Sequence, residues 1–378
     1  MPETAGLLEI RDRGSGFLRR REHSYLAAPG DIHVGQGLIR RFGLRTGDEI
    51  AGETNGKVER GRSPSLSRVT TVNGRPPEQV LRRPEFSRLS AIHPKERLTL
   101  ECGRTHRGQP DPTNRIIDLL VPFGKGQRAL IVSPSKAGKT TVLQSIAEGI
   151  VSNYPDALLL ILLADERPEE VTEMEMCGFG EVVASSFDFP PERHVAVAEI
   201  TLERARRRVE SGEDVVLILD SITRLARAYN TIDRDTSGRT LSGGLSSTSM
   251  ERPKRFFGSA RAVEPSQGGG SLTVVATALI DTGSRMDQVI FEEFKGTGNS
   301  ELVLARELAE QRIYPAIDLT ASATRKEELL LSPEELRLSR AIRKRLAGSQ
   351  PVQAMSELLE MLKSKSTEDL LKIAAETP

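Results

Sequence analysis

The sequence predicts an α/β protein with a parallel sheet, preceded by a small β-barrel. Residues 1–75 contain short strand-like runs, among them "GLLEI" and "DIHV", which are separated by Gly, Pro and Asp. Residues 76–112 are rich in Pro and Arg and are typical of a connector. From residue 113 to 378, strand-like and helix-like runs alternate, which indicates a parallel sheet. The strands expected there are 128–132, 157–164, 182–186, 214–220 and 272–280.

The composition indicates a charged globular protein without a membrane span. The chain has 378 residues, with 37% hydrophobic and 4% aromatic residues and no Trp. No apolar run reaches the ~20 residues of a spanning helix. The N-terminus "MPETAGLLEI" lacks a basic start and an apolar core, so we expect no secretory signal. We expect a cytoplasmic location instead. Cys102 and Cys177 have no metal-ligand spacing, and a disulfide framework is not expected.

The charge is distributed unevenly along the chain. The formal net charge is zero, which by itself argues against a nucleic-acid binder. Residues 1–120, however, contain 21 Lys and Arg against 15 Asp and Glu, whereas the remainder contains 32 against 38. This asymmetry favours a polyanionic partner for the N-terminal part.

The stretch "IVSPSKAGKTT" (131–141) has the pattern of a phosphate-binding loop. It lies between the apolar run "RALIV" (128–132) and a run with helical spacing (141–150). In such loops the backbone N–H groups bind phosphates, the lysine reaches the β- and γ-phosphates, and the Ser/Thr hydroxyl binds Mg²⁺. Here Ser133 stands where the motif usually has its first glycine, a position that serves the turn out of the strand.

Two further strand ends carry carboxylates. "EDVVLILD" ends in Asp220, where a Mg²⁺-organising carboxylate belongs, although the same pattern can be a helix N-cap. The run "ALLLILLADE" ends in Asp165 and Glu166, which could activate the attacking water or could be the acidic first turn of a helix. Arg325 precedes a helix and could be either an arginine finger that acts on a neighbouring subunit or an exposed surface arginine.

Several long motifs resemble the bacterial transcription termination factor Rho family. They include "DERPEEVTEM", "LDSITRLARAYNT", "RPKRFFGSAR", "TALIDTGSRMD" and "EEFKGTGN". "SPSKAGKT" is similar as well, since this family tolerates a small residue other than glycine at the start of the loop. The resemblance extends from "LLEI" to the end of the chain.

The resemblance implies a RecA-like P-loop ATPase domain behind an OB-like, cold-shock-like RNA-binding barrel. It implies a homohexameric ring that uses ATP and Mg²⁺, translocates 5′ to 3′ along nascent single-stranded RNA as a helicase, and terminates transcription at RNA polymerase. Glu166 would be the catalytic base, Thr140 and Asp220 would bind Mg²⁺, and Arg325 would be the finger. Nucleotide would be bound by Gly124, Lys125, Gly126, Gln127, Arg128, Ala129, Lys136, Ala137, Gly138, Lys139, Thr140, Thr141, Arg167 and Tyr314.

The same resemblance implies two RNA sites. One is on the barrel and the other is formed by two channel loops, with Arg224 linking the nucleotide site to RNA. The barrel residues would be Gly14, Ser15, Gly16, Phe17, Leu18, Arg19, Asp31, Ile32 and His33. The channel residues would be Arg239, Thr240, Leu241, Ser242, Gly243, Gly244 and Arg285, in loops that by themselves could be ordinary flexible loops.

The sequence departs from the family pattern in the barrel. The family typically has an aromatic residue where Ser15 stands and often a tyrosine where His33 stands. A helical segment that commonly precedes the barrel is not expected here. We therefore expect a weakened primary RNA site, unless Tyr25 compensates.

Two other functions stay open from the sequence. One is a RecA-like ATPase that does not translocate on RNA, and the other is a nucleotide-regulated RNA-binding protein without turnover. Arg239 and Arg285 in the channel loops favour RNA translocation over an ATPase that does not move on RNA. The presence of Lys139, Glu166, Asp220 and Arg325 argues against an RNA-binding protein without ATP turnover.

Overall fold

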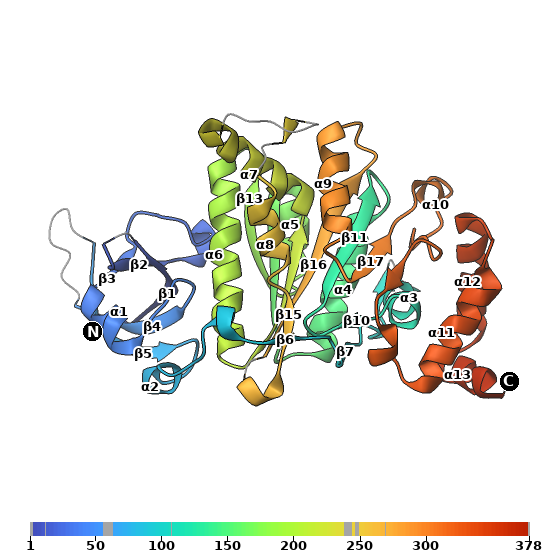
Figure 1. Cartoon of the computed structure of the whole chain (residues 1–378), viewed down its shortest axis with the longest axis horizontal. Coiled ribbons are helices and arrows are strands. Elements are labelled where there is room, and N and C mark those ends of the chain that lie inside the picture. Colours follow the sequence, from blue (N-terminus) through green and yellow to red (C-terminus); the bar gives the residue numbers. More distant parts are fainter. Residues whose placement is uncertain are drawn as a thin grey trace.

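The computed structural model describes residues 3–11, 13–55, 63–106, 108–237, 244–245, 249–268 and 270–376. Three parts follow one another along the longest axis (Figure 1): an N-terminal barrel, a large central sheet, and a group of C-terminal helices. No helix in the described ranges is long and apolar enough to span a bilayer.

The barrel is a five-stranded antiparallel sheet that curls on itself. Its strand order is β3-β2-β1-β4-β5, and a bridge between His33 and Ser65 brings the first and last strands together. The strands alternate between buried and exposed side chains, so one face encloses a small apolar core. Gly52 allows the sheet to curl tightly, because a Cβ there would lie 2.1 Å from the Arg68 carbonyl oxygen. The elements are β1 (Glu3–Ile10), β2 (Gly16–Arg19), β3 (Ile32–Val34), α1 (Gln36–Phe42), β4 (Glu49–Thr54) and β5 (Leu66–Val72).

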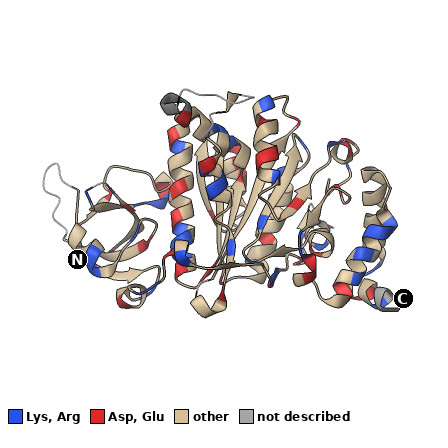
Figure 2. Ribbon diagram, in the orientation of Figure 1, with Lys and Arg blue, Asp and Glu red and all other residues tan. Residues whose placement is uncertain are grey.

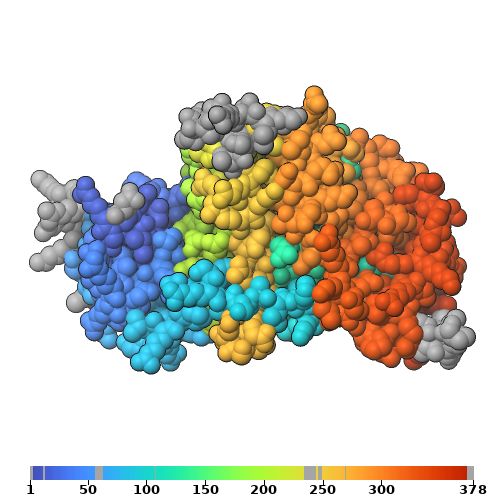
Figure 3. All heavy atoms as spheres, viewed as in Figure 1, coloured from blue at the N-terminus to red at the C-terminus, as the bar shows by residue number. Residues whose placement is uncertain are grey.

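The connector runs along one face of the molecule from the barrel toward the C-terminal part, and its atoms are cyan in Figure 3. It is not a free linker, because two of its short strands pair with the ATPase part: β6 with β15, and β7 with β10. Its elements are α2 (Pro77–Val80), β6 (Ala91–Ile92), β7 (Arg97–Leu98), β8 (Thr105–His106) and β9 (Gln109–Pro110).

The central sheet contains nine strands, and the six that form its middle are parallel. The order β13-β12-β14-β16-β11-β17 ends with the antiparallel β18, while β15 and β6 extend from β16. Runs such as "LLLILL" in β12 are apolar throughout because the middle strands are buried on both faces. Besides β6, its strands are β11 (Arg128–Pro134), β12 (Leu158–Glu166), β13 (Glu181–Ser186), β14 (Asp214–Asp220), β15 (Arg261–Val263), β16 (Ser271–Ile280), β17 (Ser300–Val303) and β18 (Ala323–Thr324). The short strand β10 (Phe123–Gly124) pairs with β7 in a separate two-stranded sheet.

Helices cover both faces of this sheet, which confirms the predicted α/β class (Figure 1). Alternate residues of β11 and β12 belong to two different cores, one under α4 and the C-terminal helices and the other under α6, α7 and α9. Charges of both signs alternate along α6 (Figure 2). The helices are α3 (Thr113–Leu120), α4 (Lys139–Asn153), α5 (Pro168–Met176), α6 (Pro191–Glu210), α7 (Ile222–Ser237), α8 (Glu251–Phe257), α9 (Arg285–Lys295), α10 (Arg306–Glu310), α11 (Pro333–Leu346), α12 (Pro351–Ser364) and α13 (Thr367–Glu376).

All five strands predicted for the second part exist, as β11, β12, β13, β14 and β16. Because β11, β12 and β14 are parallel neighbours or near neighbours, their carboxyl ends meet at one edge of the sheet. This edge carries the phosphate loop, Glu166 and Asp220.

Candidate functional site

The phosphate loop links the end of β11 to the start of α4. Gly138 has φ 86° and occupies the N-cap of α4, a conformation that favours glycine, and Lys136 has φ 63°. Ser133 is still part of β11, is buried, and does not have a positive φ. Its hydroxyl donates to the Pro134 carbonyl at 2.9 Å. A glycine is therefore not needed at this position, and the loop geometry is formed with serine.

Lys139 lies between two carboxylates from different strands. Its Nζ donates to Asp220 Oδ1 at 2.6 Å and to Glu166 Oε1 at 3.2 Å. Burial alone would lower the pKa of Lys139, but Asp220 and Glu166 outweigh it and raise the pKa. The lysine is therefore fully charged, and the sheet edge places it where a phosphate would need a cation.

Glu166 has the environment of a general base. Its side chain is 1% exposed. Burial, followed by the negative charge of Asp220, raises its pKa to about 7, against the opposing effects of Lys139 and Arg224. Arg224 Nε lies 3.1 Å from Glu166 Oε1, and Arg224 Nη1 donates to the Asp165 carbonyl at 2.6 Å. A carboxyl group with a pKa near neutrality can both accept and release a proton at neutral pH.

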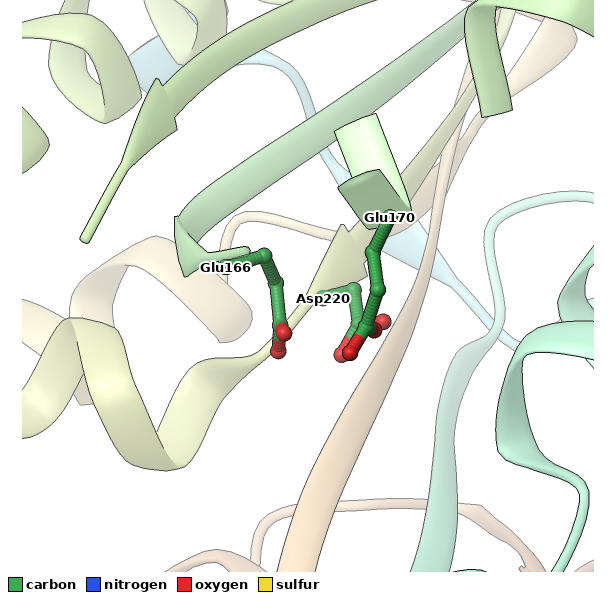
Figure 4. A group of neighbouring side chains, drawn as sticks. All are labelled: Glu166, Glu170 and Asp220. Atoms are coloured by element: carbon green, nitrogen blue, oxygen red, sulfur yellow. The ribbon is translucent and has the colours of Figure 1, made fainter. Parts of the chain in front are cut away.

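The donor set fits Mg²⁺. Carboxylate oxygens of Glu166, Glu170 and Asp220 lie within 4.8 Å of one another (Figure 4). Glu166 Oε2 is buried and has no hydrogen-bond partner, and Asp220 Oδ1 is oriented by the Thr277 hydroxyl at 2.7 Å. A hard cation prefers oxygen ligands of this kind. Glu170 and Thr277 were not predicted from the sequence. Glu170 lies in the acidic first turn of α5, directly after Glu166 and Arg167 in "DERPEE", and this was an available signal, whereas Thr277 has none.

Lys139, Glu166 and Glu170 line a cleft of about 920 Å³. Tyr314 closes one end of the cleft with its ring against the loop, since a Cβ at Gly138 would lie 3.5 Å from the Tyr314 ring. Tyr314 as a residue is 47% exposed, so part of it remains accessible from the solvent. The predicted residues that line the cleft are Lys136, Ala137, Gly138, Lys139, Thr140, Thr141, Glu166, Arg167, Arg224 and Tyr314.

A second group of predicted nucleotide residues lies elsewhere. Residues 124–129 lead into β11 and form its start, and they therefore lie at the opposite end of the strand from the loop. There the Gly126 N–H donates to the Thr273 hydroxyl at 2.8 Å, and Lys125 is paired with Asp214 at 2.8 Å. The structure does not bring Gly124, Lys125, Gly126, Gln127, Arg128 or Ala129 to the cleft of the same chain.

Arg325 also lies away from this cleft. Its backbone N–H donates to the Asn299 carbonyl at 2.9 Å, and its side chain is exposed. It is a neighbour of Arg128: burial and then the charge of Arg325 lower the pKa of Arg128. Two arginines thus lie together outside the cleft of their own chain.

The barrel candidates divide into buried and accessible residues. Leu18 belongs to the barrel core. Arg19 and Asp31 are buried and bonded to each other at 2.5 Å, and Arg19 Nε also donates to Glu9 at 2.6 Å. Their charged atoms are thus committed within the barrel in this structure. Gly14, Ser15 and Ile32 are half-buried, and Gly16 is buried.

Phe17 and His33 form the accessible aromatic surface of the barrel. Their ring centroids are 5.6 Å apart in an edge-to-face arrangement, on neighbouring strands, and both residues are half-buried. Tyr25, the predicted alternative platform, is 7% exposed and donates to Glu181 of the ATPase part. Tyr25 therefore cannot replace the missing aromatic residue at Ser15, because its ring is covered.

The channel loops are only partly described. Arg239, Thr240, Leu241, Ser242 and Gly243 lie outside the described residues. Gly244 accepts a hydrogen bond from the Asn230 side chain at 3.2 Å. Arg285 is the first residue of α9 and is exposed.

Comparisons with known proteins agree with this architecture. The Rho termination factor, RNA-binding domain family matches residues 4–78, and the ATP synthase alpha/beta family, nucleotide-binding domain, matches residues 113–324. A transcription termination factor Rho from Gemmatimonas aurantiaca is 55% identical over 95% of this chain, and the chain spans 48% of that relative's length. The Buchnera aphidicola (Acyrthosiphon pisum) and Escherichia coli K12 factors are each 52% identical over 96% of the chain, which spans 85% of each.

Solved structures show the same fold in other ATPases. A prototypical ATPase from a type III secretion system aligns with a TM-score of 0.63 at 22% identity, covering 85% of this chain and 93% of the other. The assembled ATPase EscN, in complex with its central stalk EscO, aligns with a TM-score of 0.53 at 28% identity, covering 67% and 58% of the two chains. With an RNA-binding barrel, a P-loop ATPase domain and relatives of more than half identical sequence, this chain belongs to the transcription termination factor Rho family and is an RNA-binding ATPase.

Proposed function

We propose that this chain is an RNA-dependent ATPase that moves 5′ to 3′ along nascent single-stranded RNA and terminates transcription by releasing the RNA from RNA polymerase. The observation that carries the proposal is the junction, in one chain, of a Rho RNA-binding barrel and a cleft in which Lys139, Glu166 and Asp220 meet. The barrel binds the RNA, and the cleft hydrolyses the ATP that drives movement along it.

Each residue in the cleft has a definite task. The backbone N–H groups of residues 136–141, the dipole of α4 and Lys139 bind the phosphates. Glu166 accepts a proton from the attacking water, and Tyr314 stacks on the base. Thr140 and Asp220 would hold Mg²⁺, which neutralises phosphate charge when bound. Arg167, at the mouth of the cleft, adds a second cation beside the phosphates.

The active form is a homohexameric ring. Arg325 and Arg128 lie together but outside their own cleft, which suits two cations offered to the nucleotide of a neighbouring subunit. The same arrangement accounts for the predicted nucleotide contact of residues 124–129, because this segment can reach a nucleotide only across a subunit boundary.

The proposal is tested by ATP hydrolysis with and without single-stranded RNA. We expect strong stimulation by poly(C) RNA and none by duplex DNA, followed by RNA release from stalled polymerase complexes. Hydrolysis that is indifferent to RNA would instead assign the chain to ATPases that do not translocate on RNA. RNA binding without hydrolysis would assign it to nucleotide-regulated RNA-binding proteins.

A further inference from the structure

The backbone immediately before Glu166 is strained. Asp165 has φ 60°, in the left-handed region that non-glycine residues rarely adopt, and the pairing of β12 with β13 shifts register between Ala164 and Glu166. The bulge turns the Glu166 side chain toward Lys139 and Asp220. Such a conformation is unfavourable by itself and persists only where neighbouring groups hold it.

Two side chains hold this bulge. Arg224 donates to the Asp165 carbonyl, as described above, and His194 at the start of α6 faces the Asp165 carboxylate with Nε2 at 3.8 Å from Oδ1. This is an electrostatic contact rather than a hydrogen bond. On the other side of the ring, Nδ1 lies 2.7 Å from the Ser185 hydroxyl of β13. An ionised carboxylate can only accept hydrogen bonds, so the tautomer with the proton on Nε2 suits the contact with Asp165. In this tautomer Nδ1 accepts a hydrogen bond from the Ser185 hydroxyl.

His194 and Ser185 are both buried, at 4% and 1% exposure. This burial excludes a nucleophilic role for Ser185, because no substrate reaches its hydroxyl. The histidine is instead part of the wall behind Glu166. Its backbone belongs to α6, and its ring contacts Ser185 of β13.

The barrel contacts the same strand. The Ser24 hydroxyl of the barrel donates to the Ala184 carbonyl at 2.8 Å, one residue before Ser185. At the other end of β13, Glu181 accepts from Tyr25 of the barrel, and Arg204 of α6 donates to the Tyr25 hydroxyl at 2.8 Å. Both elements that hold His194 are therefore attached to the barrel, and α6 stands between the barrel and the sheet (Figure 1).

Ser24 and Tyr25 belong to a loop that starts and ends at candidate RNA-binding residues. Arg19 ends β2 before the loop, and Asp31 lies directly before β3. Asp31 Oδ2 accepts from both Arg19 and the backbone N–H of Ala28, at 2.5 and 2.8 Å. A change in the Arg19–Asp31 pair thus acts on both ends of the loop that contacts β13.

We propose that His194 is a positioning residue for Glu166, and that Ser24 connects the RNA-binding barrel to it through β13. RNA bound at the barrel acts on the loop between Arg19 and Asp31, Ser24 transmits the change to Ala184 and Ser185, and His194 with Asp165 sets the orientation of Glu166. The proposal rests on the role of Glu166 given above. The path lies within one subunit, and contacts between the subunits of the ring act in addition to it.

The first test separates positioning from binding. In the full-length protein with RNA, His194→Ala is expected to lower kcat for ATP about tenfold or more, since small displacements of catalytic groups are costly, with little change in KM for ATP. His194→Gln, which can keep a donor toward Asp165, is expected to recover most of the rate. A wild-type kcat for His194→Ala in a folded ring, or an equal loss for His194→Gln, overturns the positioning role.

The second test addresses the barrel connection. Ser24 has φ 51°, so Ser24→Gly removes the hydroxyl without adding backbone strain. We expect this variant to bind RNA and to hydrolyse ATP without RNA as the wild type does, while RNA stimulation falls several-fold. Arg45→Met is the matched control. It removes another barrel contact with α6, the 2.8 Å pair with Glu210 at the far end of the helix from His194, and it should keep full stimulation.

Contact along a path does not by itself establish coupling, so the two substitutions must be combined. If Ser24 acts through His194, the loss of stimulation in the double variant is no larger than in His194→Ala alone. Independent, multiplying losses overturn the path. Failure of the proposed function is distinguishable, because it shows in the wild type as hydrolysis indifferent to RNA, or in an active Glu166→Gln variant.

Discussion

Lys139 is held by two carboxylates whose tasks differ. Asp220 is 2.6 Å from its Nζ and is fixed by Thr277, whereas Glu166 is 3.2 Å away and keeps one oxygen without a partner. The closer and better-oriented carboxylate suits the organisation of a cation. Glu166, whose pKa is raised, suits proton transfer.

This difference predicts different behaviour for two substitutions. Lys139→Ala should weaken ATP binding and abolish turnover, because the phosphates lose their cation. Glu166→Gln should keep ATP binding and lower turnover by about 100-fold or more, because shape is retained and the base is lost. Nucleotide titration and single-turnover hydrolysis measure the two effects. Near wild-type turnover by Glu166→Gln would assign the base to another residue, with Asp165 next in line.

Asp118 gives a pH-dependent prediction outside the site. Its carboxylate accepts the backbone N–H groups of Leu100 and Glu101, joining α3 to the connector. Burial raises its pKa to about 6, although Arg97 opposes this. The folded pKa lies above the unfolded value, so the folded protein takes up a proton as pH falls through 6, and the ionised group costs about 3 kcal/mol at pH 7.

The measurement is the unfolding midpoint of wild type and Asp118→Asn at pH 7 and pH 5. Between these values the wild type should gain stability relative to the variant, since only the wild type can be protonated there. A difference between the two proteins that stays constant with pH would show that Asp118 has an ordinary pKa.

At the scale of elements, β2 and β3 of the barrel present a small aromatic surface. Phe17 and His33 are adjacent and half-buried, whereas Arg19 and Asp31 are bonded to each other and Tyr25 is covered by the ATPase part. Ser15 lies two residues before Phe17, and side chains two apart in an extended chain lie on the same face. An aromatic side chain at position 15 is therefore expected on the same face as Phe17.

Ser15→Phe should strengthen RNA binding by the full-length protein. A base stacked on an aromatic ring contributes about 1–3 kcal/mol in single-strand-binding barrels, so pyrimidine-rich RNA should bind about fivefold or more tightly. The salt dependence should change little, because the number of phosphate contacts is unchanged. Thr4→Phe is the control, because Thr4 lies at the opposite end of β1 from Glu9, the residue that pairs with Phe17. Unchanged affinity in a folded Ser15→Phe protein would show that Ser15 does not occupy a stacking position.

At the scale of the whole molecule, we propose that a neighbouring subunit completes the nucleotide cleft. Arg325 and Arg128 adjoin each other, and neither lines the cleft of its own chain. Two neighbouring arginines repel each other, and an anion from outside the chain relieves this repulsion. A nucleotide phosphate in the adjacent subunit of a ring is such an anion.

Mixed rings test this arrangement. Arg325→Ala and Lys139→Ala subunits should each be inactive alone, yet rings that contain both should recover part of the ATPase activity. Recovery is expected because some interfaces then join an intact Lys139 to an intact Arg325. Mass measurement must confirm that rings contain both subunits. If mixed rings of confirmed composition are inactive, Arg325 acts within its own subunit and not on the neighbouring one.

The sequence by itself determined the strands of the ATPase part, the phosphate loop and the carboxylates at the ends of β12 and β14. These features depend on local periodicity and on short motifs, so neighbouring residues are sufficient to define them. The sequence also indicated the barrel, because short strands punctuated by Gly, Pro and Asp are local patterns as well. Serine at position 133 could be accepted only by resemblance, and the structure supplied the physical reason, which is that this residue still belongs to β11.

Only the tertiary structure decided which of the predicted residues lie together. It separated Gly124–Ala129 and Arg325 from the cleft, covered Tyr25, and joined Arg19 to Asp31. It also added Glu170, Thr277 and His194 to the surroundings of Glu166. Contacts of this kind depend on the order of strands in the sheet and on the packing of the barrel against α6. Both are set by burial between segments far apart in the chain, which no local pattern records.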